Sequence, residues 1–474
     1  MTEDNRKFDL NIEHVLEHWT IAHALREVIA NALDEAALTG TDEPLIFKDD
    51  NGSWHIKDAG RGLCYEHLTQ NENMEKLKHS DLVIGKFGVG LKDALATFDR
   101  HNIQVFVFSP HGDITIDTSP KHGFANIKTL HAIIHSPSRP HQVGTEFILT
   151  GLKDEDITKA KDFFLLYSGD EVISKTPYGT ILRHSRKKAR IYVNGLFVAE
   201  EENFLFSYNI TSLTTALKKA LNRERTNVGR TAYTERVKST LLACQDPVVA
   251  DVLARDLQKL DRGTAHDELQ WTDVQRHACR ILNANEKVVF VTSEQLLKGG
   301  SLITYAQQDG YRIVVIPNTI AIGLNNLKDI YGNVINTLDE YLQEWNDSFH
   351  FTFIDPDQLN PNEQAIYMLT ESIMRLLLKR PKIVKQVLIS ETMRLNSLSN
   401  HEALGVWEEK EQRIVIKRSQ LQDPASYAGT LLHECIHALS GTEDETLEFE
   451  NELTQCLGIL AEQLLKIKSS RKTM

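Results

Sequence analysis

Three short motifs follow one another in the first hundred residues, and their order constrains the fold of this chain more than any other feature of its sequence. The first lies in residues 11–40, where apolar residues recur at helical spacing up to Gly40, so we expect one long amphipathic helix or two short ones. Glu27 and Asn31 stand four residues apart and therefore share a helix face, with Asp34 one turn further along. A carboxylate beside an amide at this spacing can position a water molecule and hold Mg²⁺.

The second and third motifs are rich in glycine. Residues 58–62 (DAGRG) place Asp58 before Gly60 and Gly62, where the backbone can pass close to a flat base while the acid accepts a hydrogen bond from an exocyclic amine. Residues 85–92 (GKFGVGLK) open a helix, and a glycine-rich turn at a helix N-terminus holds phosphates through its free N–H groups. The sequence therefore predicts a nucleotide site.

The stretches around these motifs predict an α+β domain over residues 1–152. Residues 46–58 alternate around an Asn-Gly turn, as a hairpin does, and residues 102–110, 113–119 and 145–152 have the composition of strands.

Together the three motifs resemble the GHKL ATPases, the superfamily of gyrase, the ninety-kilodalton heat-shock chaperone and the mismatch-repair ATPases. The resemblance implies a GHKL (Bergerat) α/β sandwich that hydrolyses ATP with Mg²⁺. It makes Glu27 the general base, Asn31 the magnesium ligand and Asp58 the adenine anchor, with Thr145 supporting adenine through water. It also makes Gly85, Gly88 and Gly90 a flexible lid over the phosphates. The remaining motif residues complete the expected nucleotide site: Asp34, Gly60, Gly62, Lys86, Phe87, Val89 and Leu91.

Residues 153–265 change to strands followed by helices and resemble the transducer domain of the same ATPases. In that branch a second domain supplies a basic residue to the γ-phosphate, and the site is completed when two protomers meet. Arg223 or Arg225 is the candidate, since a developing phosphoryl charge needs a cation. The alternative, to which the residues give equal weight, is that residues 222–225 are a solvated helix end.

A second constellation lies near the end of the chain. His433, Glu434 and His437 form an HExxH motif after a helix-like segment, so both imidazoles share one helical face and can bind Zn²⁺. Glu434 can then act as general base for a water molecule. Downstream, a turn at Gly441 is followed by acids at helical spacing.

The order of strand, HExxH helix, turn and glutamate-rich helix resembles the gluzincin-like zinc metallopeptidases over residues 355–474. The resemblance makes Glu450 the first choice for the third zinc ligand, with Glu448 and Asp444 as rivals. The strand before the helix, residues 411–421, is expected to be the sheet edge along which an extended peptide adds its backbone. A helix with two hydrogen-bonded histidines and no metal is the plain structural alternative.

The composition of the chain limits the classes of partner that we expect it to bind. The 53 Lys and Arg against 66 Asp and Glu give a formal charge of −13, which disfavours a globally basic surface for nucleic acid. The densest cationic run, residues 183–190, fits a solvated turn better than a phosphate-binding patch. No stretch has the roughly 20 apolar residues of a membrane helix, and the five cysteines are odd in number without CxxC spacing. We expect a cytoplasmic protein with reduced thiols.

The sequence thus predicts a multidomain α+β protein with an ATPase domain at 1–152, a transducer-like domain at 153–265, a small α/β linker domain at 266–354 and a zincin-like domain at 355–474. The function that follows is an ATP-regulated zinc metallopeptidase acting on a protein or peptide as a nucleotide-dependent homodimer, a combination that would suit bacterial anti-phage defence. The alternative is a chaperone-like or nucleic-acid-clamping ATPase with a structural or inactive zinc site.

Overall fold

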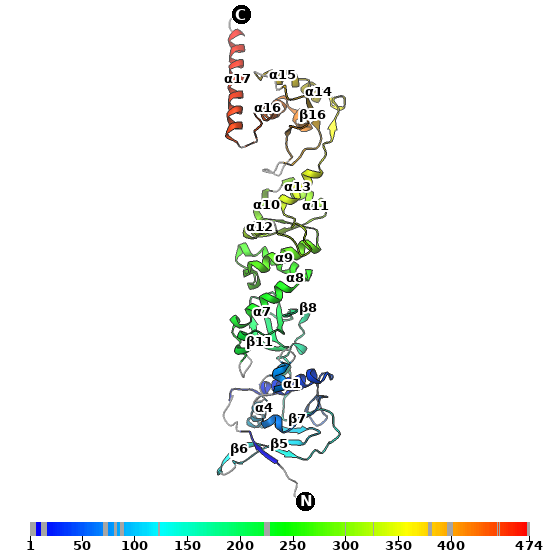
Figure 1. The fold of residues 1–474 in the computed structure, drawn as a ribbon, viewed down its shortest axis with the longest axis vertical. Coiled ribbons are helices and arrows are strands. Elements are labelled where there is room, and N and C mark those ends of the chain that lie inside the picture. Colours follow the sequence, from blue (N-terminus) through cyan, green and yellow to red (C-terminus); the bar gives the residue numbers. More distant parts are fainter. Residues whose placement is uncertain are drawn as a thin grey trace. The chain divides into compact units, whose positions relative to one another are not determined.

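The computed structural model (Figure 1) describes most of the chain, which divides into two compact units, Met1–Ile281 and Leu282–Met474. The residues described are 6–10, 17–69, 74–79, 83–85, 90–121, 124–221, 228–298, 300–325, 327–377, 382–395, 402–442, 444 and 446–471. The predicted site residues Lys86, Phe87, Gly88, Val89, Arg223 and Arg225 lie outside them.

The first unit begins with an antiparallel sheet in the order β1-β6-β5-β4-β7-β3-β2, counted over the described residues. The hairpin predicted around the Asn-Gly turn is confirmed, since β2 and β3 pair there. The strands are β1 (Arg6–Asp9), β2 (Leu45–Lys48), β3 (Trp54–Lys57), β4 (Gln104–Phe108), β5 (Asp113–Lys121), β6 (Phe124–His135) and β7 (Glu146–Thr150).

Helices α1 (Ile21–Thr39) and α4 (Gly90–Arg100) pack together against this sheet (Figure 1). The apolar residues of α1 recur every three or four positions, so Leu25, Val28 and Ile29 are buried in the core, and the helix ends at Gly40 in the left-handed conformation (φ 67°). Two shorter helices, α2 (Glu66–Thr69) and α3 (Met74–Lys78), lie between β3 and α4 in the chain.

The second part of this unit has a five-stranded sheet in the order β11-β10-β12-β9-β8, in which β10 and β12 are parallel. Its strands are β8 (Glu171–Thr176), β9 (Gly179–Arg183), β10 (Ala189–Val193), β11 (Leu196–Glu201) and β12 (Ser207–Ile210). Its helices are α5 (Asp154–Lys161), η1 (Leu165–Tyr167), α6 (Thr215–Ala220), α7 (Arg230–Ala243), α8 (Pro247–Leu257), η2 (Leu260–Arg262), η3 (Asp267–Gln270) and α9 (Thr272–Asn285).

Helix α5 connects the two parts of the first unit. Ile157, Ala160 and Phe164 share a buried core with the helices of the first sheet, and α5 packs on α1. The core of the first sheet therefore continues past the predicted boundary at residue 152.

The second unit begins with two parallel strands and their helices. The first strand is buried along its whole length, whereas in the second only Val314 is buried, and the connection between them contains two helices. The elements are β13 (Val288–Val291), α10 (Ser293–Lys298), α11 (Gly300–Gln308), β14 (Arg312–Val315), α12 (Asn318–Leu324) and α13 (Leu338–Ser348).

The last part of the chain has a sheet in the order β15-β16-β18-β17 over the described residues. The sequence placed β18 at the edge, and this is wrong: β18 pairs with β16 on one side and β17 on the other, so β17 forms the edge. The elements are β15 (Phe353–Ile354), η4 (Pro356–Gln358), α14 (Pro361–Tyr367), α15 (Thr370–Met374), β16 (Gln386–Ser390), β17 (Gly405–Glu408), β18 (Arg413–Lys417), η5 (Arg418–Gln422), α16 (Pro424–Ser440) and α17 (Leu447–Arg471).

Two further expectations can be compared with the described residues. None of the helices they form has the length and apolar character needed to cross a bilayer. The five cysteines are not paired with one another in the structure.

Candidate functional sites

A cavity of about 310 Å³ lies in the first domain, between α1, the loop after β3 and the start of α4. Five residues predicted for the nucleotide site line it: Asn31, Asp58, Gly62, Leu91 and Thr145. The cavity also has polar lining residues that no sequence motif singled out: Glu35, Arg61, Cys64, His67, Glu75, Lys76 and His111. The three motifs are thus brought to one place by the fold.

Asp58 is held rigidly in the wall of this cavity. One of its oxygens, Oδ1, accepts hydrogen bonds from the backbone N–H of Gly60 (2.9 Å) and of Thr145 (3.2 Å). Gly144 has a positive φ of 77°, and a Cβ there would lie 2.0 Å from the carbonyl oxygen of Asp58. Burial raises the pKa of Asp58, and the nearby charge of Glu35 raises it further. A fixed, buried acceptor of this kind suits the exocyclic amine of a base.

Glu27 does not line the cavity but lies against the first residue of α4, where a Cβ on Gly90 would fall 2.2 Å from Glu27 Oε2. Its other oxygen accepts from Nε and Nη2 of Arg26, at 3.1 and 2.8 Å. Both side chains are buried, and the guanidinium of Arg26 lies over the rings of Trp19 and Phe163. Arg26 therefore holds the carboxylate of Glu27 in place beside the first residue of α4.

Asp34 has a different place from the one its helix position predicted. Its side chain is fully buried and accepts hydrogen bonds from the backbone N–H groups of Ile84 and Gly85. It also accepts from Lys76 Nζ, which bridges Asp34 Oδ2 at 2.7 Å and Asn31 Oδ1 at 2.9 Å. Asp34 thus fixes the segment before the glycine-rich turn and does not face the cavity directly.

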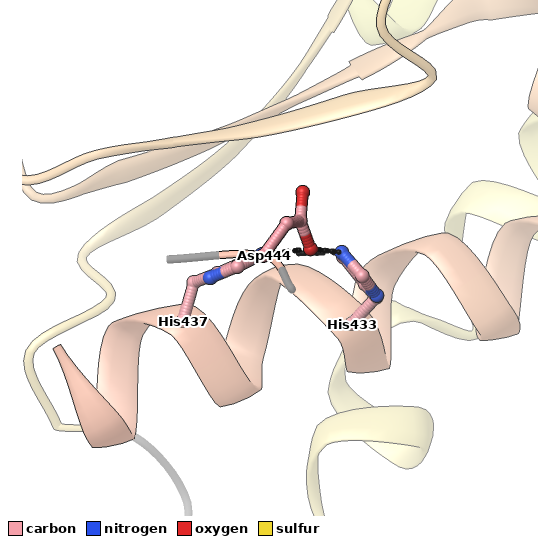
Figure 2. A group of neighbouring side chains, drawn as sticks. All are labelled: His433, His437 and Asp444. Atoms are coloured by element: carbon pink, nitrogen blue, oxygen red, sulfur yellow. Dashed lines mark hydrogen bonds and ion pairs between the residues drawn. The ribbon is translucent and has the colours of Figure 1, made fainter. Parts of the chain in front are cut away.

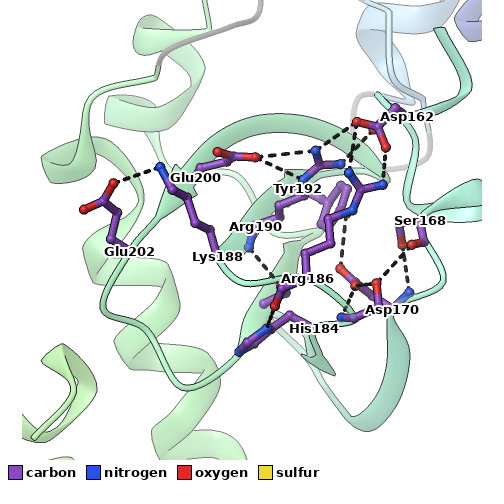
Figure 3. Close-up of polar contacts among 12 residues, drawn as sticks. Asp162, Ser168, Asp170, His184, Arg186, Lys188, Arg190, Tyr192, Glu200 and Glu202 are labelled. Atoms are coloured by element: carbon purple, nitrogen blue, oxygen red, sulfur yellow. Dashed lines mark hydrogen bonds and ion pairs between the residues drawn. The ribbon is translucent and has the colours of Figure 1, made fainter. Parts of the chain in front are cut away.

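The cationic run at residues 183–190 lies at the turn between β9 and β10 (Figure 3). Each of four cations in it pairs with an acid of the same domain: Arg183 with Glu171, Arg186 with Asp162, Lys188 with Glu202, and Arg190 with both Asp162 and Glu200. These pairs largely neutralise the run, which weakens the case for a phosphate-binding patch and supports the solvated-turn interpretation.

The HExxH motif lies on α16, which begins with Asp423 as N-cap and Pro424, and ends at Gly441 in the left-handed conformation. His433 and His437 project from the same face, and Asp444 on the following loop lies over the helix between them (Figure 2). Asp444 Oδ1 is 3.1 Å from His433 Nε2 and 3.2 Å from His437 Nε2, and the two Nε2 atoms are 3.1 Å apart.

The imidazole of His437 is oriented by its surroundings. Its Nδ1 lies 2.7 Å from the carbonyl oxygen of Thr442, which can only accept, so Nδ1 carries the proton and Nε2 presents a lone pair. The ring of Phe449 stacks on His437 at 4.2 Å and meets His433 edge-on at 4.9 Å. Burial lowers the pKa of His433, which favours the neutral imidazole that a metal needs.

Glu434, next to His433 on α16, lies against the edge strand β17. A Cβ on Gly405 would lie 2.8 Å from Glu434 Oε1, so the absence of a side chain here lets the strand pass close to the carboxylate. Burial raises the pKa of Glu434 to about 8, and the charge of Asp444 adds to the effect. A carboxyl group with a raised pKa next to a metal-ligand group can take a proton from water and return it.

Glu450, the first choice for the third ligand, is exposed on the first turn of α17 and is not part of the ligand group that the described residues form. Its neighbour Phe449 faces the histidines instead. The geometry therefore favours Asp444, because the left-handed turn at Gly441 folds the loop back over α16.

Comparison with known proteins gives a family. A sequence family described as the Mycoplasma pneumoniae MPN635 N-terminal domain matches residues 155–247, which run from α5 into α8. An uncharacterized protein of Mycoplasma pneumoniae is 39% identical over 241 residues, a match that covers 50% of this chain and 96% of that protein. The chain belongs to the family of this protein. A second uncharacterized protein of the same organism is 25% identical over 335 residues, covering 66% of this chain and 94% of its own length.

Both relatives are described only as uncharacterized proteins, so the geometry of the two sites indicates what they can do. Tetrahedral zinc with bonds of about 2.0–2.1 Å separates its ligand atoms by about 3.3 Å. The three Nε2 and Oδ1 atoms here are 3.1–3.2 Å apart and have one oriented imidazole among them, so they fit zinc. Three protein ligands also leave a fourth position for water, as in catalytic zinc sites. In the cavity, Asn31 Oδ1 accepts a hydrogen bond from the ammonium of Lys76. An amide oxygen that faces a cation in this way fits Mg²⁺ as a ligand.

Proposed function

We propose that this protein is an ATP-regulated zinc metallopeptidase. The observation that carries the proposal is the convergence of His433, His437 and Asp444 to within hydrogen-bond distance of one another, with Glu434 buried beside them on the same helix. A helix with two unrelated histidines would give neither the compact ligand group nor the buried carboxylate.

In the metallopeptidase half, zinc supplies Lewis-acid activation of a water molecule and of the scissile carbonyl when it is bound. His433, His437 and Asp444 hold it, and the carbonyl of Thr442 keeps His437 in the required tautomer. Glu434 takes the proton from the attacking water and passes it to the leaving amine. The edge strand β17, which touches Glu434 through Gly405, is the strand to which an extended peptide adds its backbone.

In the nucleotide half, the resemblance to GHKL ATPases and the shared cavity support ATP as the ligand of the first domain. Asp58 and Thr145 hold the base, Asn31 holds Mg²⁺, and Glu27 is the general base for the hydrolytic water. The cation that completes the γ-phosphate site comes from Arg223 or Arg225, and two protomers meet when nucleotide is bound.

A contact within the first unit supports a relay from this pocket. Asn194, at the turn between β10 and β11, donates its side-chain N–H to the carbonyl of Val83 at 2.9 Å. Val83 directly precedes the two residues that Asp34 holds, so a shift of the glycine-rich segment reaches the second sheet. To act as a switch, ATP has to bind one conformation more tightly than the other, since equal affinity shifts nothing.

The test uses the purified full chain loaded with Zn²⁺ and incubated with casein and a peptide library, with and without ATP. We expect new peptide termini that depend on zinc and on nucleotide, and none with the Glu434→Gln variant. Stoichiometric zinc without cleavage under any nucleotide condition would contradict the proposal and favour a chaperone-like ATPase with structural zinc.

A further inference from the structure

Lys76 of α3 bridges two residues of α1 at the wall of the cavity. Its Nζ lies 2.7 Å from Asp34 Oδ2 and 2.9 Å from Asn31 Oδ1, and only 13% of its side chain is exposed. We propose that Lys76 binds the nucleotide's phosphates from its anchor on Asp34 and competes with Mg²⁺ for Asn31. The inference rests on the proposed nucleotide function of this cavity, and no sequence motif pointed to Lys76.

The anchor is strong because Asp34 is buried. Its carboxylate has no exposed surface, and it accepts hydrogen bonds from two backbone N–H groups and from the ammonium of Lys76. Taking the ammonium away would leave a buried negative charge with neutral donors, which is costly in a region that excludes water. Lys76 therefore keeps its bond to Asp34 when its other contacts change.

The bond to Asn31 is the one that can be exchanged. Asn31 is a neutral amide, so the ammonium loses less on leaving it than on leaving Asp34. Mg²⁺ would approach the same amide oxygen at about 2.1 Å. With Lys76 already 2.9 Å from that oxygen, two cations would share one neutral ligand, and their repulsion moves the ammonium away.

A phosphate is the partner that the ammonium then meets. Lys76 and Asn31 both line the cavity, so phosphate oxygens that shared Mg²⁺ with Asn31 would come within reach of the ammonium. An ammonium has three N–H donors, so it can keep Asp34 and still donate to phosphate. Arg61, the other arginine or lysine among the described lining residues, is held by Glu35 and Glu75 and is less free to exchange.

The test compares the affinity for a fluorescent, non-hydrolysable ATP analogue in excess EDTA with the affinity in saturating Mg²⁺. The quantity compared is the dissociation constant in EDTA divided by the dissociation constant in Mg²⁺. In Lys76→Met we expect this ratio to be at least about tenfold higher than in the parent protein. Without Mg²⁺ the variant binds more weakly, because it lacks the ammonium that contacts the phosphates. With Mg²⁺ this loss is offset, because the ammonium that competes with Mg²⁺ for Asn31 is also gone. Lys76→Arg, which keeps the charge, should stay near the parent ratio. Lys78→Met, an exposed lysine of the same helix, should leave the ratio unchanged.

The outcomes separate three cases. If Lys76 only braces α1 against α3, Lys76→Met weakens binding equally in both buffers, the ratio stays constant, and the inference is overturned. If the parent protein binds the analogue and Lys76→Met binds it identically, Lys76 alone loses its role. If the parent protein binds no analogue in either buffer, the nucleotide function of the cavity fails and Lys76 fails with it.

Discussion

Asp58 in the cavity and Asp444 in the metal-ligand group are both predicted to meet a ligand, but the fold holds them differently. Asp58 is 6% exposed and is fixed by two backbone N–H groups, and the side chain of Asp34 close by has no exposed surface. Asp444 lies on a short loop with 44% of its side chain exposed, and His433 is 36% exposed. The proposed nucleotide pocket is therefore preformed, whereas the proposed metal site includes a residue, Asp444, that is half exposed on a loop.

This difference fits a molecule in which one site is the sensor and the other is controlled. A sensor gains from a rigid pocket, because its binding free energy is then available to favour one conformation. A controlled site gains from a ligand on a loop, because small movements there have large effects on metal geometry.

The largest effect is expected at the metal group. Glu434→Gln removes the base without emptying the ligand positions, so peptide cleavage should fall by roughly 10³-fold while bound zinc stays the same. Cleavage of a fluorogenic peptide and metal analysis by mass spectrometry measure the two quantities. Glu452→Gln, an exposed glutamate of α17, is the matched control. A Glu434→Gln variant with parental activity would remove Glu434 from catalysis.

At the preformed site, Glu27→Gln should lower ATP hydrolysis by about 10²-fold and change analogue binding by less than about threefold. Glutamine is preferred to alanine because Arg26 donates to this side chain in a buried position. Phosphate release and analogue titration give the two values, with exposed Glu43→Gln as control. Hydrolysis at the parental rate would show that another group activates the water.

The helix-borne residues of both sites could be predicted because a spacing of four fixes a common face. The structure brings His433 and His437 together in this way, whereas Asn31 lines the cavity and Glu27 lies against Gly90 instead. The loop ligand could not be ranked correctly, because the turn at Gly441 and the packing of Phe449 decide which acid reaches the histidines. Lys76 carried no signal, since its partners on α1 are more than 40 residues away.

Strand order shows the same limit on a larger scale. The strand character of residues 413–417 was predictable from their composition. Their position inside the sheet depends on pairing with β16, which no local pattern records. The helical periodicity of residues 363–379 favours one helix, yet the described part forms the two short helices α14 and α15.

The choice of the exposed ligand can be tested directly. Asp444→Asn should weaken zinc binding by roughly 10- to 100-fold, since a charged ligand becomes a neutral one, and Glu450→Gln should leave it unchanged. Competition with a fluorescent chelator gives both affinities. If Glu450→Gln weakened zinc binding and Asp444→Asn did not, Glu450 would be the third ligand. The contrast between the buried Asp58 and the exposed Asp444 would then carry no meaning for the metal site.

The smallest effects are expected for alanine substitutions at Gly144, which lies against Asp58, and at Gly405, which lies against Glu434. Gly144→Ala places a Cβ against the backbone of Asp58 at a positive φ, and we expect a loss of about 1–3 kcal/mol in unfolding free energy together with weaker nucleotide binding. Gly405→Ala meets only the side chains of Thr430 and Glu434, which can shift, so its stability loss should be smaller. Denaturant unfolding of the two variants measures this, and a larger loss at Gly405 would mean that the metal region is the more rigid one.

The most direct measurement of the regulatory claim is the rate of peptide cleavage by the zinc-loaded protein without nucleotide, with ATP and with a non-hydrolysable analogue. The account predicts that the rate with bound analogue differs from the nucleotide-free rate by at least about fivefold, the low end of typical coupling between sites. Equal cleavage rates at saturating nucleotide would contradict it.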